Sequence, residues 1–107
     1  MKAAERELLL FSELEPEQIK IKKVYVDQAE NFITTFVMGD ESKPKIVLVH
    51  GYGGSGALLY RVFKHLITEF QVFAIDLIGM GSSSRPPFDC QNNEQADFYM
   101  LDYMEKW

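Results

Sequence analysis

The sequence is poor in cysteine, in basic residues and in long apolar stretches. Its only cysteine, Cys90, cannot form an internal disulfide, so nothing indicates an oxidising compartment. Eleven basic residues against sixteen acidic ones give a net charge of −5, which argues against nucleic acid as a partner. The apolar run Leu8–Phe11 is far shorter than the ~20 residues of a membrane span, and no secretory signal is evident. We therefore expect a cytoplasmic or organelle-interior protein, including positions peripheral to lipid surfaces, without a transmembrane segment.

The composition predicts a single globular domain. The chain has 107 residues, of which 47% are hydrophobic and 13% aromatic, as in a folded protein rather than a disordered tail. Basic residues gather only at Lys20, Lys22 and Lys23. On a strand, Lys20 and Lys22 share one face, which we interpret as solvated and assign no function.

The first half of the chain predicts a helix followed by a β-hairpin. Apolar positions within Ala3–Leu14 recur at helical spacing, and Pro16 discourages continuation of the helix. Such a helix either covers the edge of the domain, which we favour, or binds a lipid surface or a partner. Two apolar runs, Ile19–Val26 and Phe32–Met38, are separated by a short polar turn, as in a hairpin.

The second half predicts one βαβ unit and a closing helix. The apolar run Ile46–Val49 is typical of a strand buried on both faces, and Leu59–Ile67 has the spacing of an amphipathic helix. Val72–Ile75 predicts the next strand, and a long loop over 76–93 follows. Asn92 or Asn93 then caps a helix bearing the apolar residues Phe98, Leu101 and Met104. The predicted fold class is α/β, with an N-terminal helical segment (1–18) and an incomplete α/β domain (19–107).

Six residues between the Ile46–Val49 strand and the following helix form a glycine-rich loop with two interpretations. Gly51, Gly53 and Gly56 satisfy the G-x-G-x-x-G pattern of dinucleotide-binding folds, and Asp76 stands where a ribose-binding acid would stand. Against this interpretation, a hairpin precedes the βαβ unit, and Tyr60 is bulky for the close helix packing of such folds.

The other interpretation treats His50-Gly51-Tyr52-Gly53-Gly54 as the oxyanion-hole loop of a hydrolase. Glycine allows the main chain to approach a substrate carbonyl and to adopt positive φ. A donor of this kind contributes ~3–4 kcal/mol to transition-state stabilisation. We expect the backbone N–H groups of Tyr52 and Gly53 to be the donors, and His50, Gly51 and Gly54 to shape the loop around the substrate.

Two further polar residues receive structural interpretations. His50 precedes the glycines and resembles a general base, yet we interpret it as orienting the loop through hydrogen bonds. Asp76 directly follows a buried strand and opens the loop Asp76–Pro86, where we expect its carboxylate to accept backbone N–H bonds. Neither cofactor nor metal is predicted.

These two loops together resemble those of the α/β-hydrolase superfamily. The segment Gly79–Asp89, followed by a helix ending at Trp107, is similar to the subgroup of lysophospholipases and the CGI-type lipolysis coactivator. This resemblance implies a serine-hydrolase-type lipid ester hydrolase acting on a lipid or acyl ester. It also implies a noncatalytic coactivator module, completed by a partner, as an alternative. The dinucleotide-binding fragment remains a remote third interpretation.

The resemblance also implies what this stretch of chain does not contain. The family's nucleophile, acid and catalytic histidine follow in that order after the helix that ends near Trp107, and the 107 residues hold no G-x-S-x-G. We therefore expect an N-terminal fragment, inactive alone. The family's sheet order would leave Ile46–Val49 as an exposed apolar edge, open to self-association or to a protein partner.

Overall fold

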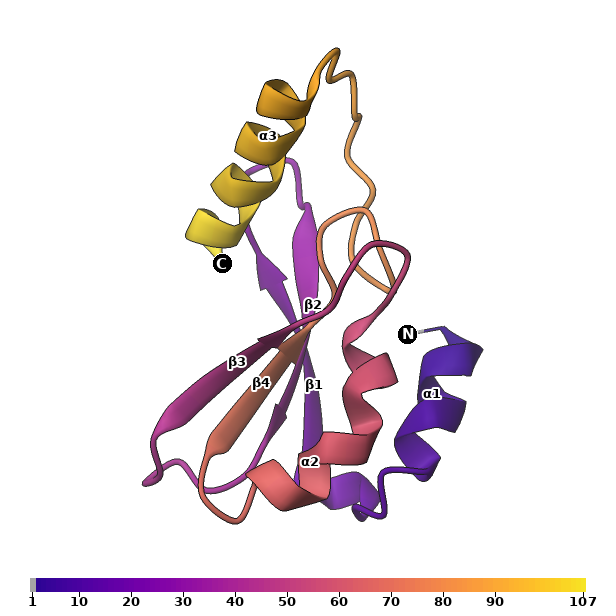
Figure 1. Cartoon of the computed structure of the whole chain (residues 1–107), viewed down its shortest axis with the longest axis vertical. Helices are drawn as coiled ribbons and strands as arrows, with labels where there is room; N and C mark the ends of the chain where they lie inside the picture. The colour runs from indigo at the N-terminus through magenta and orange to yellow at the C-terminus, as the bar shows by residue number, and fades with distance from the viewer. Residues whose placement is uncertain (1) are drawn as a thin grey trace.

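The structure, a computed structural model, describes residues 2–107 as one sheet with helices on both faces (Figure 1). The sequence patterns predict most of its element boundaries to within a few residues. In chain order the elements are α1 (Ala3–Leu10), the 3₁₀ helix η1 (Pro16–Gln18), β1 (Ile19–Tyr25), β2 (Phe32–Met38), β3 (Lys45–Val49), the 3₁₀ helix η2 (Gly56–Leu59), α2 (Tyr60–Leu66), β4 (Gln71–Ile75) and α3 (Asn93–Lys106).

The four strands form one sheet in the order β1-β2-β4-β3. β1 and β2 pair antiparallel as the predicted hairpin, and β2 pairs antiparallel with β4. β3 and β4 pair in parallel across η2 and α2, which confirms the βαβ unit and the α/β class.

The strand register assigns alternate residues to two faces of the sheet. One row across the strands runs Ile21, Phe36, Ala74 and Leu48. This face packs against the N-terminal segment, η2 and α2, and Phe63 of α2 is fully buried there. The opposite face carries Ile33 and Ile75 and packs against α3. Both faces therefore belong to apolar cores, as expected for a sheet with helices on both sides.

β3 lies at the edge of the sheet, as the sequence analysis predicts from the superfamily's strand order. Val47 and Val49 remain roughly half exposed on the α3 face, while Ile46 and Leu48 pack toward α2. The prediction that this strand is buried on both faces is therefore wrong for this structure. An apolar run identifies a strand, but only its neighbours in space decide how much of it is covered.

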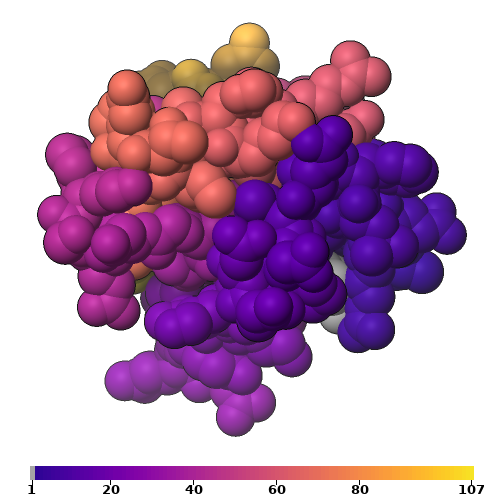
Figure 2. All heavy atoms as spheres, turned by 90° about the horizontal axis from the view of Figure 1, so that it is seen from below, coloured from indigo at the N-terminus to yellow at the C-terminus, as the bar shows by residue number. Residues whose placement is uncertain are grey.

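The N-terminal segment covers the α2 side of the sheet. α1 ends at Leu10, earlier than predicted, and Leu9 and Leu14 pack against the core while Leu10 and Phe11 are exposed. Glu13 forms an ion pair with Lys64 of α2. Figure 2 shows the resulting continuous surface, in which indigo atoms of this segment lie against pink atoms of the α2 region. Between residues 2 and 107, every helix is too short or too polar to cross a bilayer.

α3 begins as predicted but turns a different side to the sheet. The Asn92 side chain caps it by accepting a hydrogen bond from the Gln95 N–H at 2.8 Å. The predicted apolar residues Phe98 and Leu101 are exposed. The residues that pack against the sheet are Tyr99, Met100, Tyr103 and Trp107. Their aromatic rings cover apolar surface while their polar atoms reach partners, as when Trp107 Nε1 donates to Thr35 Oγ1 at 2.9 Å.

Candidate functional site

Both glycine-rich loops lie at the same end of the sheet (Figure 1). β3 and β4 are parallel, so the loop after Val49 and the loop after Ile75 leave from neighbouring carboxyl ends. Ligands of open α/β sheets bind at these ends. The fold therefore brings together the two segments that the sequence singles out.

The first loop contains a tight turn from Gly51 to Gly54. The Gly54 N–H donates to the Gly51 carbonyl at 3.0 Å, and Gly53 has φ = +75°, as the third residue of a type II turn requires. Within residues 2–107, the N–H groups of Tyr52 and Gly53 donate no hydrogen bond, whereas that of Gly54 is occupied. The Tyr52 side chain is 99% exposed at the mouth of the site. Tyr52 and Gly53 thus keep free N–H groups, as an oxyanion hole needs.

His50 is buried beneath this turn and joins the two loops. Its Nε2 accepts a hydrogen bond from the Leu77 N–H at 2.9 Å, while its Nδ1 lies 2.7 Å from the Gly51 carbonyl oxygen. A neutral ring with the proton on Nδ1 satisfies both contacts, because a backbone N–H can only donate and a carbonyl can only accept. These are the contacts that the structural interpretation of His50 requires. They leave neither ring nitrogen available as a general base.

Asp76 anchors the second loop, as predicted. Its buried carboxylate accepts hydrogen bonds from the Gly56 N–H at 2.6 Å and from the Ser82 N–H at 2.9 Å. Gly81 has φ = +54°, and a Cβ atom at this position would collide with the Asp76 carboxylate. Asp76 is therefore not available to a ribose hydroxyl, which leaves the glycine spacing as the remaining feature in favour of dinucleotide binding.

The serines of the second loop tie it to the hairpin. The Thr34 N–H donates to Ser83 Oγ at 2.8 Å, and the Phe32 N–H donates to Ser84 Oγ at 2.9 Å. Ser83 Oγ in turn donates to the Asp76 carbonyl at 2.5 Å. The backbone N–H groups at the start of β2 are thus hydrogen-bonded to the loop. The two serine hydroxyls therefore fix the loop to the hairpin, which is a structural role and not that of a nucleophile.

Glu5 reaches the same cluster from α1, and only 3% of its surface is exposed. It accepts a hydrogen bond from the Ser82 hydroxyl through Oε1, while its buried Oε2 has no polar protein partner in the described chain. Burial, followed by the neighbouring Asp76 carboxylate, raises the pKa of Glu5 from 4.5 to about 7, against the lowering effect of the Ser82 hydroxyl. A second carboxylate therefore joins the N-terminal helix to the Asp76 loop.

An apolar cleft of about 680 Å³ opens beside the first loop. Tyr52 lies at one side, and the second loop and α3 form the remaining walls. Most of the wall residues are apolar or aromatic, and they include Ile78, Met80, Pro86, Phe88, Ala96, Tyr99 and Met100. A cleft of this size and lining is suited to a hydrocarbon chain.

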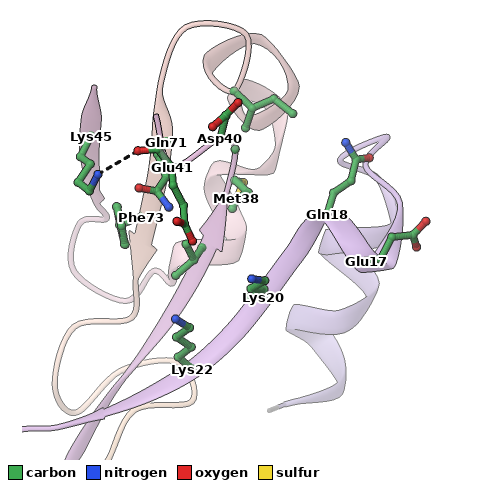
Figure 3. A pocket seen from close by; sticks show the side chains of 13 residues that line it. Glu17, Gln18, Lys20, Lys22, Met38, Asp40, Glu41, Lys45, Gln71 and Phe73 are labelled. Carbon is green, nitrogen blue, oxygen red and sulfur yellow. Dashed lines mark hydrogen bonds between the residues drawn. The ribbon is translucent and has the colours of Figure 1, made fainter. Parts of the chain in front are cut away.

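A second hollow of about 690 Å³ lies at the opposite, amino-terminal end of the parallel strands. Figure 3 shows Lys20 and Lys22 together on one face of β1, as predicted, with Phe73 and Lys45 across the sheet. Lys45 Nζ donates to the Glu41 carbonyl at 3.4 Å. This hollow mixes cations with the acids Glu41 and Asp40 and is remote from both glycine loops. It is not part of the candidate site.

Fold and loops together define an α/β protein with two glycine-rich loops at the carboxyl ends of its parallel strands. The chain belongs to the alpha/beta hydrolase fold family, whose sequence profile matches residues 44–107. The matched region includes β3, both glycine loops, β4 and α3.

Among curated proteins, the chain is similar to acyltransferases of acylglycerol phosphate. It is 42% identical over 77 residues to a probable 1-acylglycerol-3-phosphate O-acyltransferase of Oryza sativa subsp. japonica, covering 71% of this chain and 19% of that protein. It is 41% identical over 66 residues to the 1-acylglycerol-3-phosphate O-acyltransferase ABHD5 of Rattus norvegicus, covering 62% and 18%. The chain thus spans about a fifth of the length of these relatives.

Solved structures show the same fold. A membrane phospholipase A described as a bacterial virulence factor matches with a TM-score of 0.63 and 27% identity, over 92% of this chain and 29% of that one. A putative lipase from Acinetobacter baumannii AYE matches with a TM-score of 0.68 and 22% identity, over 99% and 34%. In each case this chain corresponds to about a third of the solved chain or less.

The structure brings most of the predicted loop residues to one place. Tyr52, Gly53 and Gly54 lie at the surface of the site, and His50 supports them from below. The sequence analysis did not identify Lys2, Arg85 or Met100, which also line the clefts at this end of the sheet. Arg85 had a usable signal, because it belongs to a loop that leaves a parallel strand at the same sheet edge.

Proposed function

We propose that this chain supplies the oxyanion-hole loop and part of the acyl-chain cleft of a lipid acyl hydrolase or acyltransferase. The observation that carries the proposal is the position of Tyr52, which belongs to the glycine turn and also borders the apolar cleft. An acyl chain in this cleft would bring its ester carbonyl toward the free N–H groups of Tyr52 and Gly53. The names of the relatives, an acylglycerol phosphate acyltransferase and a phospholipase A, support a lipid substrate.

The chemistry assigned to these 107 residues is binding and polarisation of an ester carbonyl. Two N–H donors preorganised at an oxyanion lower the barrier to nucleophilic attack, but they supply neither nucleophile nor base. We therefore expect no measurable turnover of p-nitrophenyl esters or lysophospholipids by the isolated chain. The division into segments 1–18 and 19–107, the compartment and a protein partner remain predictions.

Binding of a short single-chain lipid tests the proposal. We expect 1-decanoylglycerol, used below its critical micelle concentration, to shift the amide NMR signals of Tyr52 and Gly53 in the full chain. Met100→Glu places a charge on the wall of the apolar cleft and should abolish the shift. The matched control is Leu101→Glu, because Leu101 is the next residue of α3, is 63% exposed and does not line the cleft. Equal loss in both variants, or no binding by the unmodified chain, would refute the acyl site.

The noncatalytic alternative uses the same lipid site without the reaction. It is supported by the resemblance of the segment Gly79–Asp89 to the subgroup that includes the lipolysis coactivator. The gene sequence beyond the codon for Trp107 separates the two proposals. A strand followed by an intact G-x-S-x-G supports catalysis, whereas a variant in which the serine is replaced supports the coactivator role.

A further inference from the structure

A small cleft of about 320 Å³ adjoins the apolar cleft and has a different chemical character. Its wall consists mainly of the two glycine loops, with Gly53 and Gly54 on one side and Gly79 and Gly81 on the other. The charged residues that line it are Lys2 and Arg85, and its lining contains no carboxylate. In a chain with a net charge of −5, a cleft lined by two basic residues and by no acidic one favours an anionic ligand.

The two clefts share part of their walls. Tyr52, Gly79, Met80 and Arg85 line both of them. A single ligand can therefore place an apolar chain in the larger cleft and an anionic end in the smaller one. This arrangement matches a single-chain lipid with a charged headgroup.

Arg85 and Lys2 are both held near the small cleft by the fold. The Arg85 guanidinium donates to the Ser83 carbonyl at 3.1 Å and to the Gly81 carbonyl at 3.2 Å, which orients it and leaves further N–H groups for a ligand. The Lys2 backbone N–H donates to Ser82 Oγ at 3.0 Å, which fixes the start of α1 beside the same loop. An oriented guanidinium and a nearby ammonium suit a phosphate group, whose oxygens accept several hydrogen bonds and carry up to two charges.

We propose that Lys2 and Arg85 bind the phosphate monoester headgroup of a single-chain lipid whose acyl chain occupies the apolar cleft. This inference rests on the proposed function, because the acyl chain and the phosphate belong to one ligand. Arg85 binds the phosphate through its planar fork, and Lys2 adds a second positive charge from the N-terminal segment. The two residues thereby select the headgroup, while the apolar cleft selects the chain.

Three probes below their critical micelle concentrations test the headgroup site by titration calorimetry on the full chain. They are 1-decanoylglycerol 3-phosphate, the neutral 1-decanoylglycerol and glycerol 3-phosphate without an acyl chain. We expect the phosphate lipid to bind about tenfold more tightly than the neutral lipid, because only the phosphate accepts charged hydrogen bonds from Lys2 and Arg85. Glycerol 3-phosphate should bind more weakly than either lipid.

Charge-removing variants assign the effect to residues. Lys2→Gln should weaken binding of the phosphate lipid severalfold and leave 1-decanoylglycerol unchanged. Arg85→Gln should weaken it further, with its melting temperature measured because Arg85 also bonds to the loop carbonyls. Lys20→Gln removes the same charge at the opposite end of the sheet and should have no effect.

The outcomes separate this inference from the proposed function. Equal affinity for the phosphate and neutral lipids, or equal weakening by Lys20→Gln, overturns the headgroup site and leaves the acyl cleft standing. Glycerol 3-phosphate binding as tightly as the phosphate lipid makes the small cleft a site for free phosphate esters, which also overturns the lipid headgroup. Binding of neither lipid overturns the proposed function itself.

Discussion

Asp76 shows how much a single buried carboxylate organises at this site. Its two oxygens accept hydrogen bonds from the N–H of Gly56, the last residue of the first loop, and from the N–H of Ser82 in the second loop. The shapes of both loops therefore depend on one side chain. Gly81 permits this arrangement because it combines a positive φ with the close approach of its backbone to Asp76.

Two glycine substitutions in the second loop separate backbone strain from collision. Gly81→Ala introduces a methyl group against the Asp76 carboxylate as well as an unfavourable φ. We expect it to lower the free energy of unfolding by about 2–4 kcal/mol. Gly79→Ala shares the positive φ but meets open space, so it should cost about 1 kcal/mol. Urea unfolding measures both, and equal losses would refute the role of the Asp76 contact.

The raised pKa of Glu5 makes the free energy of unfolding depend on pH. Its pKa rises from 4.5 to about 7 on folding, chiefly through burial, so the folded state holds this proton more tightly than the unfolded state. The contribution of Glu5 is therefore fully present below pH 4.5 and is lost as the pH rises toward 7. Glu5→Gln should increase the free energy of unfolding at pH 8 by about 1–3 kcal/mol and change it little at pH 4.5.

Thermal melts at the two pH values measure this effect, and Glu7→Gln provides the control. Glu7 is an exposed glutamate of the same helix, so its replacement removes the same charge without touching the Asp76 cluster. If Glu5→Gln and Glu7→Gln change the melting temperature equally, or if the gain from Glu5→Gln does not depend on pH, the burial of an ionising Glu5 is refuted.

At the scale of elements, the start of α3 allows two adjacent asparagines to be compared as helix caps. The sequence left Asn92 and Asn93 as alternative caps, and the structure assigns the cap to Asn92, whose side chain accepts the Gln95 N–H. Asn92→Ala should cost about 1 kcal/mol of unfolding free energy, because an N–H in the first turn loses its partner. Asn93→Ala should be close to neutral. A larger loss for Asn93→Ala in denaturant titrations would contradict this assignment.

Local periodicity predicted the elements well because each strand or helix carries its own pattern. The hairpin, the βαβ unit and the helices α1 and α3 follow from apolar spacing, although α1 ends at Leu10, well before Pro16. The side of α3 that packs could not be predicted. Phe98 and Leu101 form one apolar stripe, while Tyr99 and Tyr103 form another, and only the position of the sheet determines which of them is buried.

The candidate site divides in the same way. The loop around Tyr52 and the anchoring role of Asp76 can be predicted from local sequence, because glycines and an acid directly follow the strands. The contacts of Glu5 and Lys2 with the site cannot be predicted in this way, since these residues lie more than seventy positions before Ser82 in the sequence. Contacts of this kind depend on how the N-terminal segment packs, and no short pattern encodes them.

At the scale of the whole molecule, the described chain is less compact than its length suggests. Its radius of gyration is 14.2 Å, against ~13 Å expected for a domain of this size. α3 covers only the upper part of its face of the sheet (Figure 1). Val47 and Val49 of β3 are roughly half exposed. Within residues 2–107, the outer edge of β3 pairs with no strand.

This free edge predicts that the isolated chain self-associates. Unpaired backbone N–H and C=O groups, together with exposed valines, template pairing with a second strand. We expect the purified chain to form dimers or larger species in sedimentation velocity. Val47→Lys should shift it toward monomer, because a charge on an edge strand opposes pairing.

Val62→Lys serves as the control, since Val62 of α2 is 42% exposed, close to the 44% of Val47, but lies on a helix. A stable monomer at high concentration, or equal effects of the two lysines, would show that the β3 edge does not drive association. Selective loss of the larger species in Val47→Lys would identify this edge as the surface that an adjoining strand or a partner covers.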